Sequence, residues 1–189
     1  MKKTIAIALM ALSSLTTLAQ ESTALVEKSI FNVQPGFLGV YINNESRLGN
    51  KWALRTEAGL DAAFSANGNT SDVWGLMPAI NLEPRYYYNI SKRAAKGKRT
   101  SKNSANFATV SLRYSPDWFI LSNKDHIITE NTVYIIPKWG IRRTIGNSGF
   151  NYEAGIGIGY YSIFGNDRKY YADPEGVALD LHLRLGYCF

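Results

Sequence analysis

The chain has 189 residues and a formal net charge of +6, with twelve tyrosines, four tryptophans and sixteen glycines. Its single cysteine, Cys188, excludes an intrachain disulfide and a cysteine metal cluster. Beyond the first twenty residues, no apolar run reaches the roughly 18 residues that a membrane-spanning helix requires. A membrane form of this chain must therefore be a closed β-barrel, because lipid requires every backbone polar group to be paired internally.

Residues 1–19 have the pattern of a secretory signal peptide. Lys2 and Lys3 precede a short apolar run, and small residues lead to Ala19, after which we predict cleavage. No cysteine lies near that point, so a lipoprotein anchor is not expected. We predict a signal peptide over residues 1–19 and one outer-membrane β-barrel domain over residues 20–189, with a net charge of +4 (+6 less the two lysines).

Most of the remaining chain alternates between apolar and polar residues with a period of two, which predicts strands. After a less clear apolar segment at residues 29–42 and a predicted polar turn at 43–50, the predicted strands are residues 51–64, 73–90, 105–120, 132–145, 150–164 and 177–189. Three prolines conflict with a closed ladder, because proline cannot donate to it. We predict bulges at Pro78, Pro84 and Pro137.

The segment at residues 177–189 shows the alternation most clearly. Its odd positions are all apolar, and its even positions include Asp180, His182 and Arg184. Thirteen residues exceed an ordinary half-buried strand and suffice for a tilted strand that crosses a bilayer, which needs about 9–11. The aromatic ending at Tyr187 and Phe189 looks like the assembly signal of bacterial outer-membrane barrels, which implies the barrel assembly machinery as a partner.

Seven strands can be identified, whereas single-chain bacterial barrels have an even number. We therefore predict an all-β, antiparallel up-and-down transmembrane barrel of eight strands, with the missing strand at residues 23–31 and a turn near Gln34-Pro35-Gly36. A distorted barrel with a disordered start, or a ten-stranded barrel, is the alternative. With the last strand ending in the periplasm, the connections at residues 165–175, 121–131 and 65–72 would lie outside, and those at 146–149, 91–104 and 43–50 inside.

The charged residues fall mostly on the face opposite to the apolar one, and so into the predicted lumen. This set contains six basic residues, five acidic residues and one histidine: Arg55, Arg85, Arg113, Lys138, Arg142, Arg184, Glu57, Asp61, Glu83, Glu153, Asp180 and His182. Side chains fill the interior of an eight-stranded barrel, and buried charges must be paired. We therefore predict a lumen plugged by an ion-pair network rather than an aqueous pore.

Catalytic and cofactor chemistry finds little support in the sequence. Asp180 and His182 share a face two residues apart, as in a general-base pair, but no motif places a nucleophile beside them. The histidines, the cysteine and the carboxylates show no metal-ligand spacing, and no glycine-rich phosphate loop precedes a helix. We expect neither enzymatic activity nor a cofactor or metal.

One connection carries the excess positive charge. Residues 91–104 contain Lys92, Arg93, Lys96, Lys98, Arg99 and Lys102 and no acidic residue. Nucleic acid is not an expected partner, because no aromatic residues interleave with these cations. We predict a mobile, solvated loop; contact with an anionic envelope polymer or with lipid headgroups is the alternative.

Four stretches carry a resemblance to a known class: residues 83–89 (EPRYYYN) with the basic segment after them, 139–143 (WGIRR), 152–160 (YEAGIGIGY) and 181–187 (LHLRLGY). In these four stretches the sequence resembles the small outer-membrane β-barrel proteins of Bacteroidota-type bacteria, in the class that includes the OmpA transmembrane domain and OmpX-like barrels. The resemblance implies a location in the outer membrane of a Gram-negative cell envelope, an unassigned molecular role and no catalytic residues.

Three functions are consistent with the sequence. The first is a structural or interaction barrel that presents outer loops, and the second is a small, porin-like channel or carrier for solutes. The third is a soluble periplasmic lipocalin-like barrel, in which the faces are inverted so that apolar residues line a cavity and Arg55, Glu57 and Glu153 face water. Membrane fractionation separates the third from the others, and conductance separates the first two.

Overall fold

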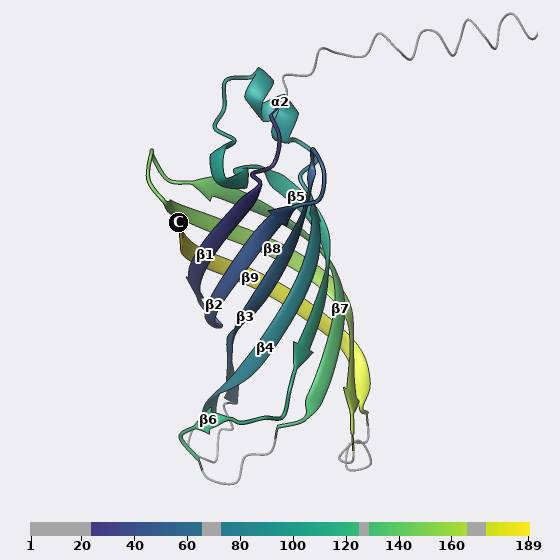
Figure 1. Cartoon of the computed structure of the whole chain (residues 1–189). Helices are drawn as coiled ribbons and strands as arrows, with labels where there is room; N and C mark the ends of the chain where they lie inside the picture. The colour runs from purple at the N-terminus through teal and green to yellow at the C-terminus, as the bar shows by residue number, and fades with distance from the viewer. Residues whose placement is uncertain (1–23, 66–72, 125–128, 166–172) are drawn as a thin grey trace, which may run out of the picture.

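The structure is a computed structural model that describes residues 24–65, 73–124, 129–165 and 173–189 (Figure 1). Its strands are β1 (Ser29–Gly36), β2 (Gly39–Arg47), β3 (Trp52–Ser65), β4 (Val73–Tyr86), β5 (Asn106–Ser115), β6 (Leu121–Ser122), β7 (Asn131–Thr144), β8 (Phe150–Phe164) and β9 (Glu175–Cys188). Two short helical segments, α2 (Ile90–Ala95) and η2 (Ser101–Asn103), lie between β4 and β5. No helix within these ranges is long and apolar enough to cross a bilayer. The predicted signal peptide lies outside the described residues.

The eight long strands close into one antiparallel barrel. Each pairs with the next long strand along the chain, and β1 pairs with β9 to complete the ring. The two-residue β6 adds a short pairing to β4 beyond the end of β5. The predicted all-β, eight-stranded antiparallel barrel is thereby confirmed.

The first two strands are not where the sequence analysis placed them. The apolar segment at residues 29–42 is a hairpin, in which β1 ends at Gly36 and β2 begins at Gly39. Gly39 has φ +143°, a conformation that favours glycine, and a Cβ there would collide with Leu60 O. The predicted turn at residues 43–50 is too long, since residues 43–47 continue β2 and only residues 48–51 connect it to β3. The eighth strand is β1, which shares only residues 29–31 with the predicted 23–31, and the turn predicted near Gln34-Pro35-Gly36 lies at residues 37–38.

The two ends of the barrel are built differently (Figure 1). At one end, which we call the capped end, α2 and η2 lie beside the start of β1 and the end of β9. At the other, which we call the open end, lie the β1–β2 turn, the carboxyl ends of β3, β5 and β8, and the short β6. The connections thus alternate between the two ends as predicted from the strand order.

Two of the prolines, Pro84 and Pro137, interrupt hydrogen bonding without adding residues. The β4–β5 ladder lacks pairs around Pro84 and resumes in the same register, and the β7–β8 ladder does the same at Pro137. The predicted bulges at these two positions are therefore wrong, because a bulge would shift the register. Beside Pro78 the β4–β5 ladder has already ended, and residues 116–120 separate β5 from β6. A few unpaired ladder positions around Pro84 and Pro137 accommodate the missing N–H groups.

The outward face of the barrel is apolar and carries an aromatic group near each end. The capped-end girdle consists of Phe31, Trp52, Tyr86, Tyr88, Trp139, Phe150, Tyr152, Tyr187 and Phe189, and the open-end girdle of Trp74, Trp118, Phe119, Tyr160 and Phe164. Between the girdles the outward side chains are aliphatic, such as Leu112, Ile135 and Ile156. Most charged side chains of the same strands point into the barrel; Arg143 near the end of β7 and Glu175 at the start of β9 lie on the outward face.

The distribution of exposure rules out the lipocalin-like alternative. That interpretation requires Arg55, Glu57 and Glu153 to face water, whereas these three residues are 0%, 5% and 0% exposed. Leu179 and Leu183, which would line its cavity, are 65% and 64% exposed. The polar face is therefore inside and the apolar face outside.

Candidate functional site

The alternation along the strands brings the predicted charged residues together in the lumen. Eight of them are at most 5% exposed: Arg55, Glu57, Glu83, Arg85, Lys138, Arg142, Glu153 and Arg184. The side chains of Asp180 and His182 are 8% and 6% exposed, and those of Arg113 and Asp61 are 19% and 18% exposed. The lumen is thus dry along most of its length and reachable by water where Arg113 and Asp61 lie.

Glu153 on β8 lies at the centre of the network. Its Oε1 accepts from Arg55 Nη1 and Arg85 Nη2, each at 2.8 Å, and its Oε2 accepts from Arg85 Nη1 at 3.0 Å. Arg85 also contacts Glu83 Oε2 at 2.5 Å. Bidentate contacts of this kind fix both partners in orientation as well as in charge. One carboxylate on β8 thereby links to β3 and β4, which are distant from it in sequence.

The network continues across β3 and β9. Arg55 Nη2 lies 2.8 Å from Glu57 Oε2, and Arg184 Nη1 lies 2.7 Å from the same oxygen. The Arg184 guanidinium also stacks 3.8 Å above the centre of the Tyr41 ring. Because buried ions are tolerated only when paired and hydrogen-bonded, these contacts explain how charged side chains fill the barrel.

Glu45 on β2 is a member of the network that the sequence analysis missed. Its Oε2 lies 3.0 Å from Arg142 Nη1, and its Oε1 accepts from Tyr87 OH at 2.7 Å and from Asn103 Nδ2. Glu45 was assigned to a polar turn, so the sequence analysis did not ask whether its side chain faces the lumen. With Glu45, the predicted set of six basic and five acidic residues becomes six basic and six acidic residues among those that the structure describes.

The basic segment after β4 folds over the capped end instead of forming the predicted mobile loop. Ile90 and Asn103 are completely buried, and Ile90 packs in an apolar cluster with Val26, Ala53, Tyr87, Ala105 and Phe107. Asn103 Oδ1 accepts from Glu27 N at 2.7 Å, and Lys102 Nζ donates to Cys188 O at 2.9 Å. Lys92, Lys96, Lys98 and Arg99 stay exposed. The segment is therefore a structural cap with a basic outer surface.

Amide side chains occupy the seam where β1 meets β9. Asn151 Oδ1 accepts from Gln34 Nε2 at 3.3 Å, and Gln34 Oε1 accepts from Asn43 Nδ2 at 3.1 Å. Cys188 faces the lumen as predicted, and its sulfur accepts from Arg142 Nη2 at 3.3 Å and Asn151 Nδ2 at 3.2 Å. These neutral groups continue the polar filling to the capped end.

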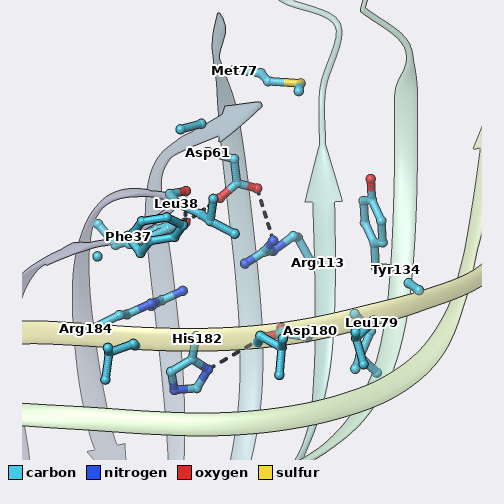
Figure 2. Close-up of a pocket in the computed structure, with 17 residues that line it drawn as sticks. Phe37, Leu38, Asp61, Met77, Arg113, Tyr134, Leu179, Asp180, His182 and Arg184 are labelled. Carbon is cyan, nitrogen blue, oxygen red and sulfur yellow. Dashed lines mark hydrogen bonds and ion pairs between the residues drawn. The ribbon is translucent and has the colours of Figure 1, made fainter. Parts of the chain in front are cut away.

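A cavity of about 230 Å³ lies at the open end of the lumen (Figure 2). On one side Asp61 accepts from Tyr41 OH at 2.7 Å and pairs with Arg113 at 3.1 Å. On the other side Lys138 Nζ lies 3.3 Å from Asp180 Oδ2 and 2.7 Å from Glu83 Oε1. Figure 2 shows His182, Asp180 and Arg184 along one strand of the cavity wall, with the apolar Phe37 and Leu38 nearby.

His182 borders the cavity together with Asp180. Its Nδ1 lies 3.7 Å from Asp180 Oδ1, and its Nε2 lies 3.3 Å from Glu153 Oε1, but neither nitrogen makes a hydrogen bond within the described structure. Among the described residues, the cavity lining contains no serine, threonine or cysteine to act as a nucleophile. The absence of enzymatic activity stays a prediction.

Tyr187 and Phe189, the predicted assembly signal, belong to a cluster of rings at the capped end. The centroids of Tyr187 and Phe189 are 5.2 Å apart, and those of Phe31 and Phe189 are 6.0 Å apart. Phe150 meets Tyr187 edge-on at 5.0 Å. The cluster therefore bridges β1, β8 and β9 on the outer surface, and the role of its two terminal rings in assembly stays a prediction.

No protein-family model matches the chain, and no curated protein or solved structure gives a significant match. The barrel is compatible with the small-barrel class named above, and nothing further links the chain to OmpA or OmpX. Among the described residues, no group of three or more histidine, cysteine, aspartate or glutamate side chains is arranged to hold a metal ion.

Proposed function

We propose that this chain is an integral outer-membrane β-barrel protein whose plugged, charged lumen supports a structural or interaction role at the cell envelope. The inside-out distribution of side chains carries the proposal. Arg55, Arg142 and Glu153 are fully buried, whereas apolar and aromatic side chains cover the outer wall. Soluble monomers rarely expose a contiguous apolar patch beyond a few hundred Å², so a wall of this kind calls for lipid around it.

The spacing of the aromatic girdles supports a bilayer location. On β8, Tyr152 belongs to the capped-end girdle and Tyr160 to the open-end girdle, eight residues further on. Eight residues cover about 27 Å along a strand, or about 20 Å along the axis of a barrel with strands tilted by about 40°. This height is close to the apolar band of about 25 Å that surrounds outer-membrane barrels.

The filled lumen argues against the channel alternative. Glu153, Arg85 and Arg55 bridge the barrel close to the capped-end girdle, and Glu45, Arg142 and the cap fill the capped end. An ion crossing the lumen would have to break several of these buried pairs. In planar bilayers the purified protein should give no steady single-channel steps, and reproducible steps would contradict a plugged lumen.

Fractionation of cells that express the full chain tests the proposal. The protein should appear in the outer-membrane fraction, should resist extraction by alkaline carbonate, and should show the gel mobility of a folded barrel until it is boiled. Recovery from the soluble periplasm would contradict the proposal. A periplasmic protein with a cleaved signal peptide provides the matched control for soluble proteins.

The partner of the capped end and the orientation of the barrel are also open to test. The exposed Lys92, Lys96, Lys98 and Arg99 on the cap would meet anionic envelope polymer or lipid headgroups on the periplasmic side. Protease added to intact cells should therefore leave the chain uncut between residues 96 and 102, and should cut there once the outer membrane is permeabilised. Cleavage in intact cells would reverse the proposed orientation.

A further inference from the structure

Arg143 places a charge on the apolar outer wall, at the level of the capped-end girdle. It lies near the end of β7 and pairs with Tyr152 of the girdle, so its side chain points outward. Its Nη1 donates to Arg142 O at 2.7 Å, and its Nη2 donates to Asn106 Oδ1 at 2.5 Å. Both acceptors are uncharged. Among the described residues, no carboxylate pairs with this guanidinium.

Arg93 on α2 brings a second positive charge to the same place. It is close enough for its charge to act on the Arg143 guanidinium. Its Nη2 donates to Arg99 O at 3.1 Å, whereas its Nε is buried and makes no hydrogen bond in the described structure. The start of α2 is held against β5, because Asn106 N donates to Asn89 Oδ1 at 2.8 Å. Two like charges are therefore fixed side by side, an arrangement that an anion between them would stabilise.

The hydroxyl group of Tyr88 adds a third donor. Its oxygen accepts from Trp139 Nε1 at 2.8 Å and from Asn106 Nδ2 at 3.1 Å. A phenolic oxygen that accepts twice still has its own proton to donate, and this proton has no acceptor among the described residues. Tyr88 and Trp139 are 41% and 46% exposed on the outward face. We call Arg93, Arg143 and Tyr88 the outward donor cluster.

The arginines inside the barrel are satisfied in a different way. Arg55 and Arg85 share the carboxylate of Glu153, and Arg184 meets that of Glu57. The lumen thus contains its own anions, whereas the outward donor cluster has only uncharged acceptors within the described structure. Its remaining capacity is for donation alone. A negatively charged group with several acceptor oxygens, such as a phosphate, is its chemical complement.

The position of the cluster indicates where the phosphate comes from. Given the proposed outer-membrane location, on which this inference rests, the rings of Tyr88 and Trp139 lie at the level of the lipid headgroups. From Arg143 toward the middle of the wall, the next outward residue of β7 is the apolar Ile141. Acyl chains attached to a phosphate at Arg143 would lie along this wall. A soluble polymer would instead meet the exposed outer surface of the cap, which carries Lys96.

We propose that the outward donor cluster binds the phosphate of an anionic phospholipid from the leaflet at the capped end. The phosphate oxygens accept from the two guanidinium groups and from Tyr88 OH, and the acyl chains run past Ile141 along the barrel. An anionic head group is preferred to a zwitterionic one, because a choline would bring a third positive charge beside Arg93 and Arg143.

Lipid retention by the full-length barrel, in nanodiscs with equal amounts of phosphatidylglycerol and phosphatidylcholine, tests the proposal. After transfer to mild detergent, native mass spectrometry should find phosphatidylglycerol on the wild-type barrel with a preference of about fivefold. Arg143→Gln removes one charge from the cluster and should abolish most of this preference. Lys96→Gln removes the same charge from the outer surface of the cap and should leave the preference unchanged. The heat-dependent shift in gel mobility verifies that each variant is folded.

A further variant separates a shaped site from a general attraction for anions. Arg143→Lys keeps the charge but loses the planar fork of donors, so the preference should fall about twofold to threefold. An unchanged preference in Arg143→Lys, or an equal loss in Lys96→Gln and Arg143→Gln, would overturn the site.

Two more outcomes would contradict the proposal. Dextran sulfate that displaces phosphatidylglycerol from wild type, and binds more weakly to Arg143→Gln, would assign the cluster to a soluble polyanion. A barrel that inserts into nanodiscs but retains both lipids equally refutes the lipid site alone. A protein recovered from the soluble periplasm refutes the proposed function as well.

Discussion

The capped end and the open end of the lumen handle the same kind of side chain in opposite ways. At the capped end Glu45 and Arg142 are completely buried, under a folded segment that contributes Asn103. At the open end Asp61 and Arg113 form a pair of similar length whose side chains are 18% and 19% exposed beside a cavity. One end is thus a packed ionic interior, and the other is an accessible pocket.

Because of this difference in exposure, the loss of one member of an ion pair should cost a different amount of stability at the two ends. Removing one partner from a buried pair leaves an uncompensated charge in a dry interior, which costs several kcal/mol. Removing one partner from a pair that water can reach costs little, because water solvates the remaining ion. The capped half should therefore determine the stability of the barrel, whereas the open half can tolerate such changes. Substitutions at comparable positions in the two halves test whether their contributions to stability differ.

The largest effect is expected at the centre of the network. Glu153→Gln removes the charge that Arg55 and Arg85 share, and it should lower the free energy of unfolding by about 3–5 kcal/mol. Reversible urea unfolding of the barrel in detergent measures the change. A loss below about 1 kcal/mol would mean that water reaches the centre of the lumen and that the two halves do not differ.

A smaller effect is expected where the barrel closes. A Cβ at Gly186 would stand 2.5 Å from Gln34 Cγ and 2.9 Å from Asn32 Oδ1, so Gly186→Ala forces β1 away from β9. We expect a cost of about 1–3 kcal/mol, as for other overpacked sites. Gly176→Ala on the open half of the same strand is the control, because its Cβ would meet Tyr161 at 3.1 Å or more and the ring can move. Equal costs would show that the seam does not limit stability.

The cap should be weakened by a change at Asn103. Asn103→Gly keeps the left-handed backbone, with φ 57°, but removes the hydrogen bonds to Glu45 and to Glu27 N. The cost should be about 1–2 kcal/mol, with faster hydrogen exchange over residues 90–104. The exposed Asn147, which accepts only from the surface residue Arg99 among the described contacts, provides the control, and Asn147→Gly should change little. Unchanged exchange in the cap would mean that Asn103 does not hold it.

The smallest effect is expected at the open end. Asp61→Asn removes the charge next to Arg113 but keeps a group that accepts from Tyr41 OH. The free energy of unfolding should change by at most about 1 kcal/mol, since water reaches both partners. A cost as large as that of Glu153→Gln would show that the open end is as dry as the capped end, and the comparison between the two would fail.

The alternation of residue types was sufficient to predict the fold class and most of the lumen. Residues 150–164 were predicted as a strand with the bounds of β8, and the parity of Glu153 and Arg184 placed both inside. Buried charges must be paired, so a charged inner face also implied an ion-pair network. Which acid meets which base could not be predicted, because the partners of Glu153 lie 68 and 98 residues away along the chain.

The failures have two physical causes. Inside a charged lumen the inward positions of a strand are as polar as a turn, so polarity did not distinguish residues 43–47 of β2 from a loop, and Glu45 was missed. The basic segment was predicted to be solvated because its charges are local, whereas its folding depends on contacts of Ile90 and Asn103 with distant residues.

The sequence by itself determined which face of each strand is apolar and that a charged inner face must balance its charges, because period and charge are local properties of the chain. Only the tertiary structure decided that α2 and η2 cap one end, that β1 and β2 are shorter than their neighbours toward the other, and that a cavity bordered by His182 lies there. These features depend on where strands of different length meet, and that is set by long-range register rather than by any local pattern.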